Sequence, residues 1–290
     1  MGLSISSHAP QTRSVDGLAI RYVDTGERHP GSTGPTGPTG PTLIMTSPWP
    51  ESLFAFRRIW DRLAPTARLI ALDLPGFGHS QARTDLFAPA SMGEFLRLFI
   101  AEFSLVRPHL LAPDVGAGAA LFLAGRHPES VSSLIVGSGA TAYPLDVGGT
   151  LADIIAAPDI EGLRAFDVRA GVGATVEAVA PQAEEPEVWQ DYVTSHEGGR
   201  FAESARYVRE YPTELPVLAD LLPTIDTPVQ VMSAEHDELV PPSNGVFLHD
   251  RLPHSRLVSF DSGHFPWEQN AAEYGDAVAE WITGGYAQPA

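Results

Sequence analysis

Residues 108–129 read PHLLAPDVGAGAALFLAGRHPE, and this stretch decides the fold of the chain. Its first part is a short apolar run that predicts a buried strand, and its Ala- and Leu-rich second part predicts a closely packed helix. Between them stands Asp114, with the small residues Ala112 and Gly116 at positions −2 and +2. A strand-to-helix turn that exposes a side chain needs such small neighbours, because the two backbones nearly touch there. The pattern indicates either a nucleophile elbow or an Asp that caps the following helix.

The composition is that of a globular protein with a substantial core. Apolar residues make up 43% of the 290 residues, enough for one large α/β domain with an insertion or for two small domains. The net charge of −18 argues against nucleic acid or an anionic membrane as partner. The chain has no cysteine, which excludes disulfides, thiolate nucleophiles and cysteine-based metal sites. No signal peptide and no long apolar run is recognisable, so we expect a soluble, cytoplasmic protein.

Short apolar runs alternate with helical patterns along most of the chain, and this spacing predicts a mostly parallel central sheet with flanking helices. Residues 141–216 lack apolar strand runs and predict a helical lid, inserted into a core of residues 1–140 and 217–290. Residues 34–42 repeat the triplet GPT and predict an extended surface loop. Strands are expected at 18–23, 42–46, 68–74, from His109 onward, 131–137, 228–233 and 256–261.

Three titratable residues follow predicted strands in a set order. Asp114 lies in the elbow, Asp237 lies in EHDELVPP at 235–242, and His264 lies in DSGHFPWE at 261–268. Nucleophile, acid and histidine follow one another in this order in the α/β-hydrolase fold. The simpler alternatives are a turn-forming role for Asp237 and a solvated loop position for His264.

These residues make the chain resemble the α/β-hydrolase superfamily over about residues 14–281. Within it, Asp at the elbow resembles the epoxide hydrolases and the haloalkane dehalogenases. The resemblance implies a covalent alkyl-enzyme ester on Asp114, a small apolar substrate, and neither metal nor organic cofactor. The motifs that carry the resemblance are PWPES at 48–52, DLPGFGHS at 73–80, APDVGAG at 112–118, EHDELVPP at 235–242 and DSGHFPWE at 261–268.

A carboxylate at position 114 suits attack on an sp³ carbon. It is ionised at neutral pH and needs no base to become a nucleophile. His264 would then activate a water molecule toward the ester, with Asp237 orienting the imidazole. Attack of Asp114 on an ordinary ester would give an anhydride, which argues against a lipase or esterase. We expect epoxide hydrolysis to a diol; the alternatives are a haloalkane dehalogenase, and a cofactor-free lyase or non-catalytic lidded binding protein.

Two positions depart from the families that the chain resembles. Ser47 and Pro48 stand where His-Gly usually precedes the oxyanion-hole residue, and Val115 stands where both families generally carry Trp. The resemblance assigns the oxyanion-hole N–H groups to the backbone of Trp49 and Val115. Dehalogenases use the missing indole N–H to hold halide, so Val115 weakens that alternative. The side chain of Trp49 could supply an indole N–H or form an apolar wall.

Epoxide opening also needs an acid, and epoxide hydrolases use lid tyrosines for this purpose. Tyr207, in SARYVREYP, lies at a place similar to the lid tyrosine of the family, and Tyr211 and Tyr192 are further choices. We therefore expect Tyr207, Tyr211 and Trp49 to contact the substrate. The alternative for Tyr207 is a ring packed under the lid.

Overall fold

The computed structural model describes residues 5, 7–26 and 40–287, so most of the expected GPT loop at 34–42 lies outside the described residues. An eight-stranded sheet runs in the order β1-β2-β4-β3-β5-β6-β7-β8. Its β1–β2 and β2–β4 pairs are antiparallel and its other pairs are parallel, which confirms the mostly parallel sheet. The strands are β1 (Gln11–Val15), β2 (Leu18–Asp24), β3 (Thr42–Thr46), β4 (Arg68–Leu72), β5 (His109–Pro113), β6 (Ser133–Gly137), β7 (Val229–Ala234) and β8 (Ser255–Phe260).

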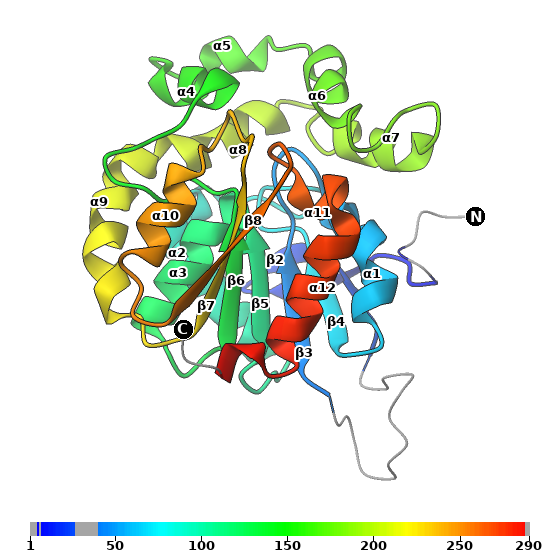
Figure 1. The fold of residues 1–290 in the computed structure, drawn as a ribbon. Helices are drawn as coiled ribbons and strands as arrows, with labels where there is room; N and C mark the ends of the chain where they lie inside the picture. The colour runs from blue at the N-terminus through cyan, green and yellow to red at the C-terminus, as the bar shows by residue number, and fades with distance from the viewer. Residues whose placement is uncertain (1–4, 6, 27–39, 288–290) are drawn as a thin grey trace.

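The central strands are apolar without alternation because helices cover both faces of the sheet. Every residue of β5, β6 and β7 is buried, whereas β2, nearer the edge, alternates between buried and more exposed positions. One face carries α1, α11 and α12, and the other carries α2, α3, α9 and α10 (Figure 1). These helices are α1 (Arg57–Leu63), α2 (Pro89–Glu102), α3 (Val115–Arg126), α9 (Tyr211–Leu221), α10 (Ser243–His249), α11 (Pro266–Gln269) and α12 (Ala271–Ile282).

Helix α3 follows the elbow and lies at the centre of the molecule. Residues 115–124 of this helix are all buried, between the sheet, α2 and α9. Its small side chains let α2 approach closely: a Cβ atom on Gly93 of α2 would lie 2.8 Å from the carbonyl oxygen of Ala119. The Ala- and Gly-rich sequence after Asp114 therefore reflects close helix packing on both sides.

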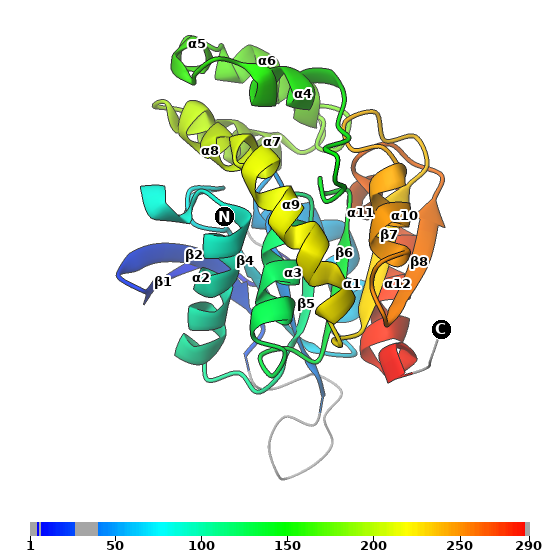
Figure 2. The ribbon, with the colours of Figure 1, turned by 90° about the vertical axis from the view of Figure 1, so that its left-hand side faces the viewer.

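The helical lid lies over the carboxyl ends of the parallel strands (Figures 1 and 2). Asp191 of the lid pairs with Arg21 of β2 at 2.6 Å, and Glu185 accepts hydrogen bonds from Arg57 of α1. Helix α9 continues through position 216, where we placed the end of the lid, and packs against α3. The other lid helices are α4 (Gly149–Ala156), α5 (Glu161–Arg164), α6 (Val168–Val176), α7 (Pro186–Thr194) and α8 (Arg200–Arg209).

No helix in the described part of the chain is long and apolar enough to span a membrane.

Candidate active site

The turn between β5 and α3 holds Asp114 in a strained backbone conformation, with φ 52° and ψ −122°. Non-glycine residues rarely adopt positive φ, and such strain occurs where a side chain must be exposed at a sharp turn. The turn has room for no larger neighbour: a Cβ atom on Gly116 would lie 2.2 Å from Oγ1 of Thr46, and one on Gly139 would lie 2.4 Å from the carbonyl oxygen of Asp114. These contacts explain the small residues that the sequence places around Asp114.

The carboxylate of Asp114 does not cap α3, because its side chain makes no capping hydrogen bond to that helix. Its Oδ2 atom instead accepts a hydrogen bond of 2.5 Å from the backbone N–H of Trp49, in the loop after β3. The capping alternative is therefore wrong. The carboxylate faces the loop from which the sequence predicted an oxyanion-hole donor.

His264 and Asp237 lie beside Asp114, at the carboxyl ends of β8 and β7. The Nδ1 atom of His264 lies 2.8 Å from Oδ2 of Asp237, and its Nε2 atom lies 3.8 Å from Oδ1 of Asp114. The other oxygen of Asp237 accepts the backbone N–H groups of Leu239 and Val240, at 3.0 and 2.8 Å. These bonds fix the Asp237 carboxylate, which in turn fixes the tautomer and the orientation of the ring.

Burial raises the pKa of Asp114 above its ordinary value, against the opposing effects of His264 and of the backbone N–H groups of Trp49 and Val115. Burial acts to lower the pKa of His264, but the hydrogen bond that its ring donates to Asp237 and the charges of Asp237 and Asp114 outweigh it, so this pKa is raised. The charged forms of Asp114 and His264 thus stabilise each other in a site that water reaches poorly.

A cavity of about 350 Å³ lies between the core and the lid and includes Asp114 and His264 in its lining. This volume falls in the range of sites for small organic molecules. Most of the lining is apolar. Representative members are Trp49, Leu151, Ile154, Phe166, Phe201 and Phe265.

The two lid tyrosines differ in what their hydroxyl groups contact. The hydroxyl of Tyr207 is buried and donates a hydrogen bond of 2.8 Å to the carbonyl oxygen of Val115, and Tyr207 is not part of the cavity lining. Tyr211 lines the cavity, and its hydroxyl makes no hydrogen bond to any described residue. Burial, and secondarily the charge of Asp114, raises the pKa of Tyr211 well above its ordinary value, so its proton is retained. Tyr192 is fully buried and contacts Arg57 at 3.3 Å instead.

The lid contributes cavity residues that the sequence analysis missed, above all Phe166 and Phe201. They belong to no motif. The only signal in the sequence was the concentration of aromatic residues in a segment without strands, which does not show which rings face the cavity.

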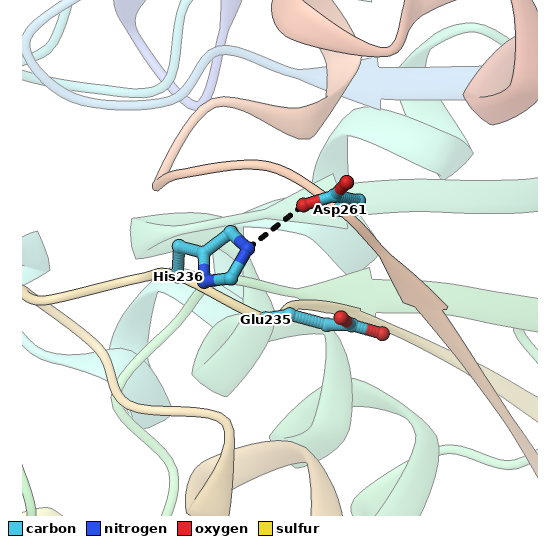
Figure 3. A group of neighbouring side chains, drawn as sticks. All are labelled: Glu235, His236 and Asp261. Carbon is cyan, nitrogen blue, oxygen red and sulfur yellow. Dashed lines mark hydrogen bonds and ion pairs between the residues drawn. The ribbon is translucent and has the colours of Figure 1, made fainter.

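One surface group offers donor atoms of the kind that bind metal ions. Glu235, His236 and Asp261 lie close together and exposed, and Nε2 of His236 is already paired with Oδ1 of Asp261 at 2.7 Å (Figure 3). The group lies outside the cavity lining. The pair joins the loops that carry Asp237 and His264, and its exposed position makes its contribution to stability small.

Known proteins share this architecture. The chain is 26% identical over 266 residues to the pimeloyl-[acyl-carrier protein] methyl ester esterase of Neisseria meningitidis, covering 82% of this chain and 91% of that protein. The structure of Cfl2 from Burkholderia cenocepacia superposes with a TM-score of 0.79 and 21% identity, covering 94% of this chain and 95% of the other. Epoxide hydrolase VrEH1 from Vigna radiata superposes with a TM-score of 0.75 and 15% identity, covering 97% and 99%.

At these identities the structural similarities establish the fold alone. The family model described as "alpha/beta hydrolase fold" matches residues 41–271, which include the elbow, the lid and the loops of Asp237 and His264. The chain therefore belongs to the alpha/beta hydrolase fold family.

Proposed function

We propose that this protein hydrolyses epoxides to diols through an ester on Asp114. One observation carries the proposal: a carboxylate, and not a hydroxyl, occupies the strained elbow, with one oxygen bonded to the Trp49 N–H and the other near His264. Tyr211, whose hydroxyl makes no hydrogen bond to any described residue, lines the same cavity. Nucleophile, base and acid are thus gathered around one apolar space.

In the first step, Oδ1 of Asp114 attacks an epoxide carbon and the carbon–oxygen bond of the ring breaks. The hydroxyl of Tyr211 gives its proton to the departing oxygen, which becomes a hydroxyl of the substrate. The Trp49 N–H stays on Oδ2, which becomes the carbonyl oxygen of the new ester. Asp237 takes no part in the bonds that form here.

In the second step, His264 takes a proton from water, and the resulting hydroxide attacks the Cγ atom of Asp114. The negative charge that develops on Oδ2 is stabilised by the backbone N–H groups of Trp49 and Val115. Collapse breaks the ester bond, and His264 returns its proton to the leaving diol oxygen. The proton that the Asp114 carboxyl group then loses restores Tyr211, so the net reaction is epoxide plus water to diol.

Haloalkane dehalogenation is the second candidate, because Nε1 of Trp49 is a buried donor without a hydrogen-bond partner in the described structure. An anionic leaving group would need such a donor. However, this atom is shielded, whereas Tyr211 lines the cavity. The arrangement therefore favours a leaving oxygen that needs a proton.

The test is capture of the ester in a His264→Gln variant, which retains the nucleophile but loses the base of the second step. With styrene oxide, the intact protein should gain the mass of the whole epoxide, on the peptide that contains Asp114. A gain of only an alkyl group from a haloalkane would indicate the dehalogenase. Asp114→Asn is the matched control and should form no adduct. If turnover of epoxides, haloalkanes and esters is the same in Asp114→Asn as in the wild type, the covalent mechanism is wrong.

A further inference from the structure

Three aromatic rings form one side of the cavity. The rings of Trp49 and Phe201 stack with centroids 5.2 Å apart and an interplanar angle of 25°, and those of Phe201 and Phe166 stack at 4.6 Å and 21°. All three residues belong to the cavity lining. We call Trp49, Phe201 and Phe166 the aromatic wall. It starts at the residue whose N–H holds Asp114 and extends into the lid.

The outer end of the wall is built around Phe166. Helix α6 approaches this ring so closely that a Cβ atom on Gly171 would lie 1.9 Å from its Cζ atom. Even so, Phe166 is 39% exposed, which is unusual for an aromatic ring that is stacked on another. A flat apolar group in the cavity would contact this ring, because Phe166 is part of the cavity lining.

Behind the wall lies a second hollow, of about 330 Å³. It shares Leu163, Phe166 and Phe201 with the cavity, but its remaining lining is largely polar and includes Arg164 and Glu197. The two phenylalanine rings therefore separate an apolar space from a polar one. The size of the Phe166 and Phe201 side chains therefore sets the extent of the apolar cavity on this side.

The charges around the cavity disfavour an anionic substrate. The charged or titratable groups of its lining are Asp114, Asp153, His264 and Tyr211, and no arginine is found among the described lining residues. The chain contains no lysine at all. A substrate carboxylate would lose its water without gaining an arginine or lysine partner, and it would be repelled by two carboxylates, one of which already faces His264.

We propose that the aromatic wall determines specificity, by selecting epoxides that carry an uncharged aryl group next to the ring that is opened. The aryl group lies along Phe166 and Phe201 while the epoxide carbon faces Asp114. This proposal rests on the proposed epoxide hydrolysis, and the experiment separates the two.

The experiment compares kcat/KM for styrene oxide and for cyclohexyloxirane, which is similar in size but not flat. The wild type should prefer the aryl substrate, and Phe166→Leu should reduce this preference roughly 2- to 10-fold, as expected for the loss of one ring–ring contact. Leu is chosen because Ala would join the cavity to the second hollow. Leu151→Ala removes volume from the aliphatic part of the lining and should lower kcat/KM for both substrates alike. An unchanged preference in both Phe166→Leu and Phe201→Leu overturns the proposal.

The charge argument is tested with 3-phenylglycidate and its methyl ester. The neutral ester should be turned over at least roughly 10-fold faster, since burying an unpaired carboxylate is strongly unfavourable. Equal or faster turnover of the carboxylate overturns the proposal.

A binding measurement makes the wall testable without catalysis. The uncharged product 1-phenyl-1,2-ethanediol should bind the wild type more tightly than its cyclohexyl analogue, and Phe166→Leu should reduce this difference. If no epoxide reacts but the aryl diol binds more tightly than the cyclohexyl diol and Phe166→Leu reduces the difference, the proposed reaction is wrong and the role of the aromatic wall in specificity is supported. If epoxides react and the two diols bind with equal affinity, the proposed role of the aromatic wall is wrong and the proposed reaction is supported.

Discussion

The Nε2 atom of His264 lies 3.8 Å from Oδ1 of Asp114, beyond hydrogen-bond distance, while Nδ1 of the same ring is bonded to Asp237 at 2.8 Å. A serine nucleophile would need a direct bond to the histidine, which removes its proton. A carboxylate has no proton to lose. The gap therefore suits a histidine that acts only after the ester has formed and that takes its proton from water.

The first prediction concerns the pH dependence of turnover. His264 must be neutral to accept a proton, and its pKa is raised in the folded protein, chiefly because Asp237 outweighs burial. Below that pKa, kcat should fall about tenfold per pH unit while the ester accumulates, since its formation does not need the neutral ring. Steady-state rates across the pH range, with intact-mass analysis of acid-quenched protein, measure both quantities.

Asp237→Asn is the informative variant for this pH profile. It removes the charge that raises the pKa of His264, so the fall in kcat should move to lower pH, and kcat on the plateau should drop roughly 10²-fold or more. If ester formation, and not its hydrolysis, follows the titration of His264, the histidine acts in the first step and the assignment of roles is wrong.

The second prediction separates the two lid tyrosines. Tyr211→Phe should slow ester formation from an epoxide by roughly 10²-fold or more, because it removes the proposed general acid. Tyr207→Phe should leave this rate within a few-fold and lower the free energy of unfolding by about 1 kcal/mol, since the Tyr207 hydroxyl bonds only the Val115 carbonyl. Rapid-quench single turnovers and urea titrations supply the two measurements. A large loss of rate in Tyr207→Phe alone would move the acid to that residue.

Tyr207 was predicted ahead of Tyr211 because its place in the sequence resembles that of the lid tyrosine of the epoxide hydrolases, and such a likeness does not show which hydroxyl faces the cavity. Two residues four apart on one helix share a face, but here α8 ends at Arg209 and α9 begins at Tyr211, so the chain changes direction between the tyrosines. Pro212 in the first turn of α9 is a sign of a helix start, and it could have indicated this break.

The grouping of Asp114, Asp237 and His264 was predictable for the opposite reason. Each follows an apolar run long enough to be read as a buried strand, and the carboxyl ends of parallel strands meet at one edge of a sheet. Contacts between distant loops have no such rule. Nothing in the sequence shows that Nε1 of Trp267 donates to Oε2 of Glu51 at 2.8 Å.

The third prediction concerns that buried contact, which ties the loop of Trp49 to the loop of His264. Burial, together with the charge of Glu268, raises the pKa of Glu51 well above its usual 4.5, although Trp267 and Arg57 act in the opposite direction. The pKa of Glu51 is higher in the folded protein than in the unfolded chain, so protonated Glu51 favours the folded state. This contribution to the free energy of unfolding is fully present below pH 4.5 and is lost as the pH rises through the folded pKa. Glu51→Gln keeps an acceptor for Trp267 and cannot ionise. Its free energy of unfolding should therefore exceed that of the wild type by a margin that grows with pH.

Urea unfolding of both proteins over a series of pH values measures this margin, which includes the effect of the substitution on the neighbouring Glu268. Glu51→Ala is the contrasting variant: it leaves the Trp267 N–H buried without its Glu51 partner, and it should be about 1–3 kcal/mol less stable than Glu51→Gln at every pH, since neither variant ionises at this position. A margin between Glu51→Gln and the wild type that does not change with pH would show that Glu51 is not buried as the structure has it.

The last prediction concerns acid stability and His109, at the start of β5. Its Nδ1 atom lies 2.7 Å from Oγ of Ser133, and burial lowers its pKa from 6.5 to about 4. Between these two values the unfolded chain binds the proton and the folded protein does not, so stability falls as the pH decreases from about 6.5 to about 4. The difference between the two pKa values of His109 corresponds to a loss of roughly 3 kcal/mol in the free energy of unfolding. The pKa of His196 is lowered to about 4 in the same way, by burial, so His196 adds to the loss of stability in acid.

His109→Gln should therefore show a shallower loss of unfolding free energy in acid, whereas the exposed His236→Gln should follow the wild type. Urea titrations at closely spaced pH values decide the matter, since parallel curves for His109→Gln and wild type would mean that His109 takes up its proton without cost in the folded state.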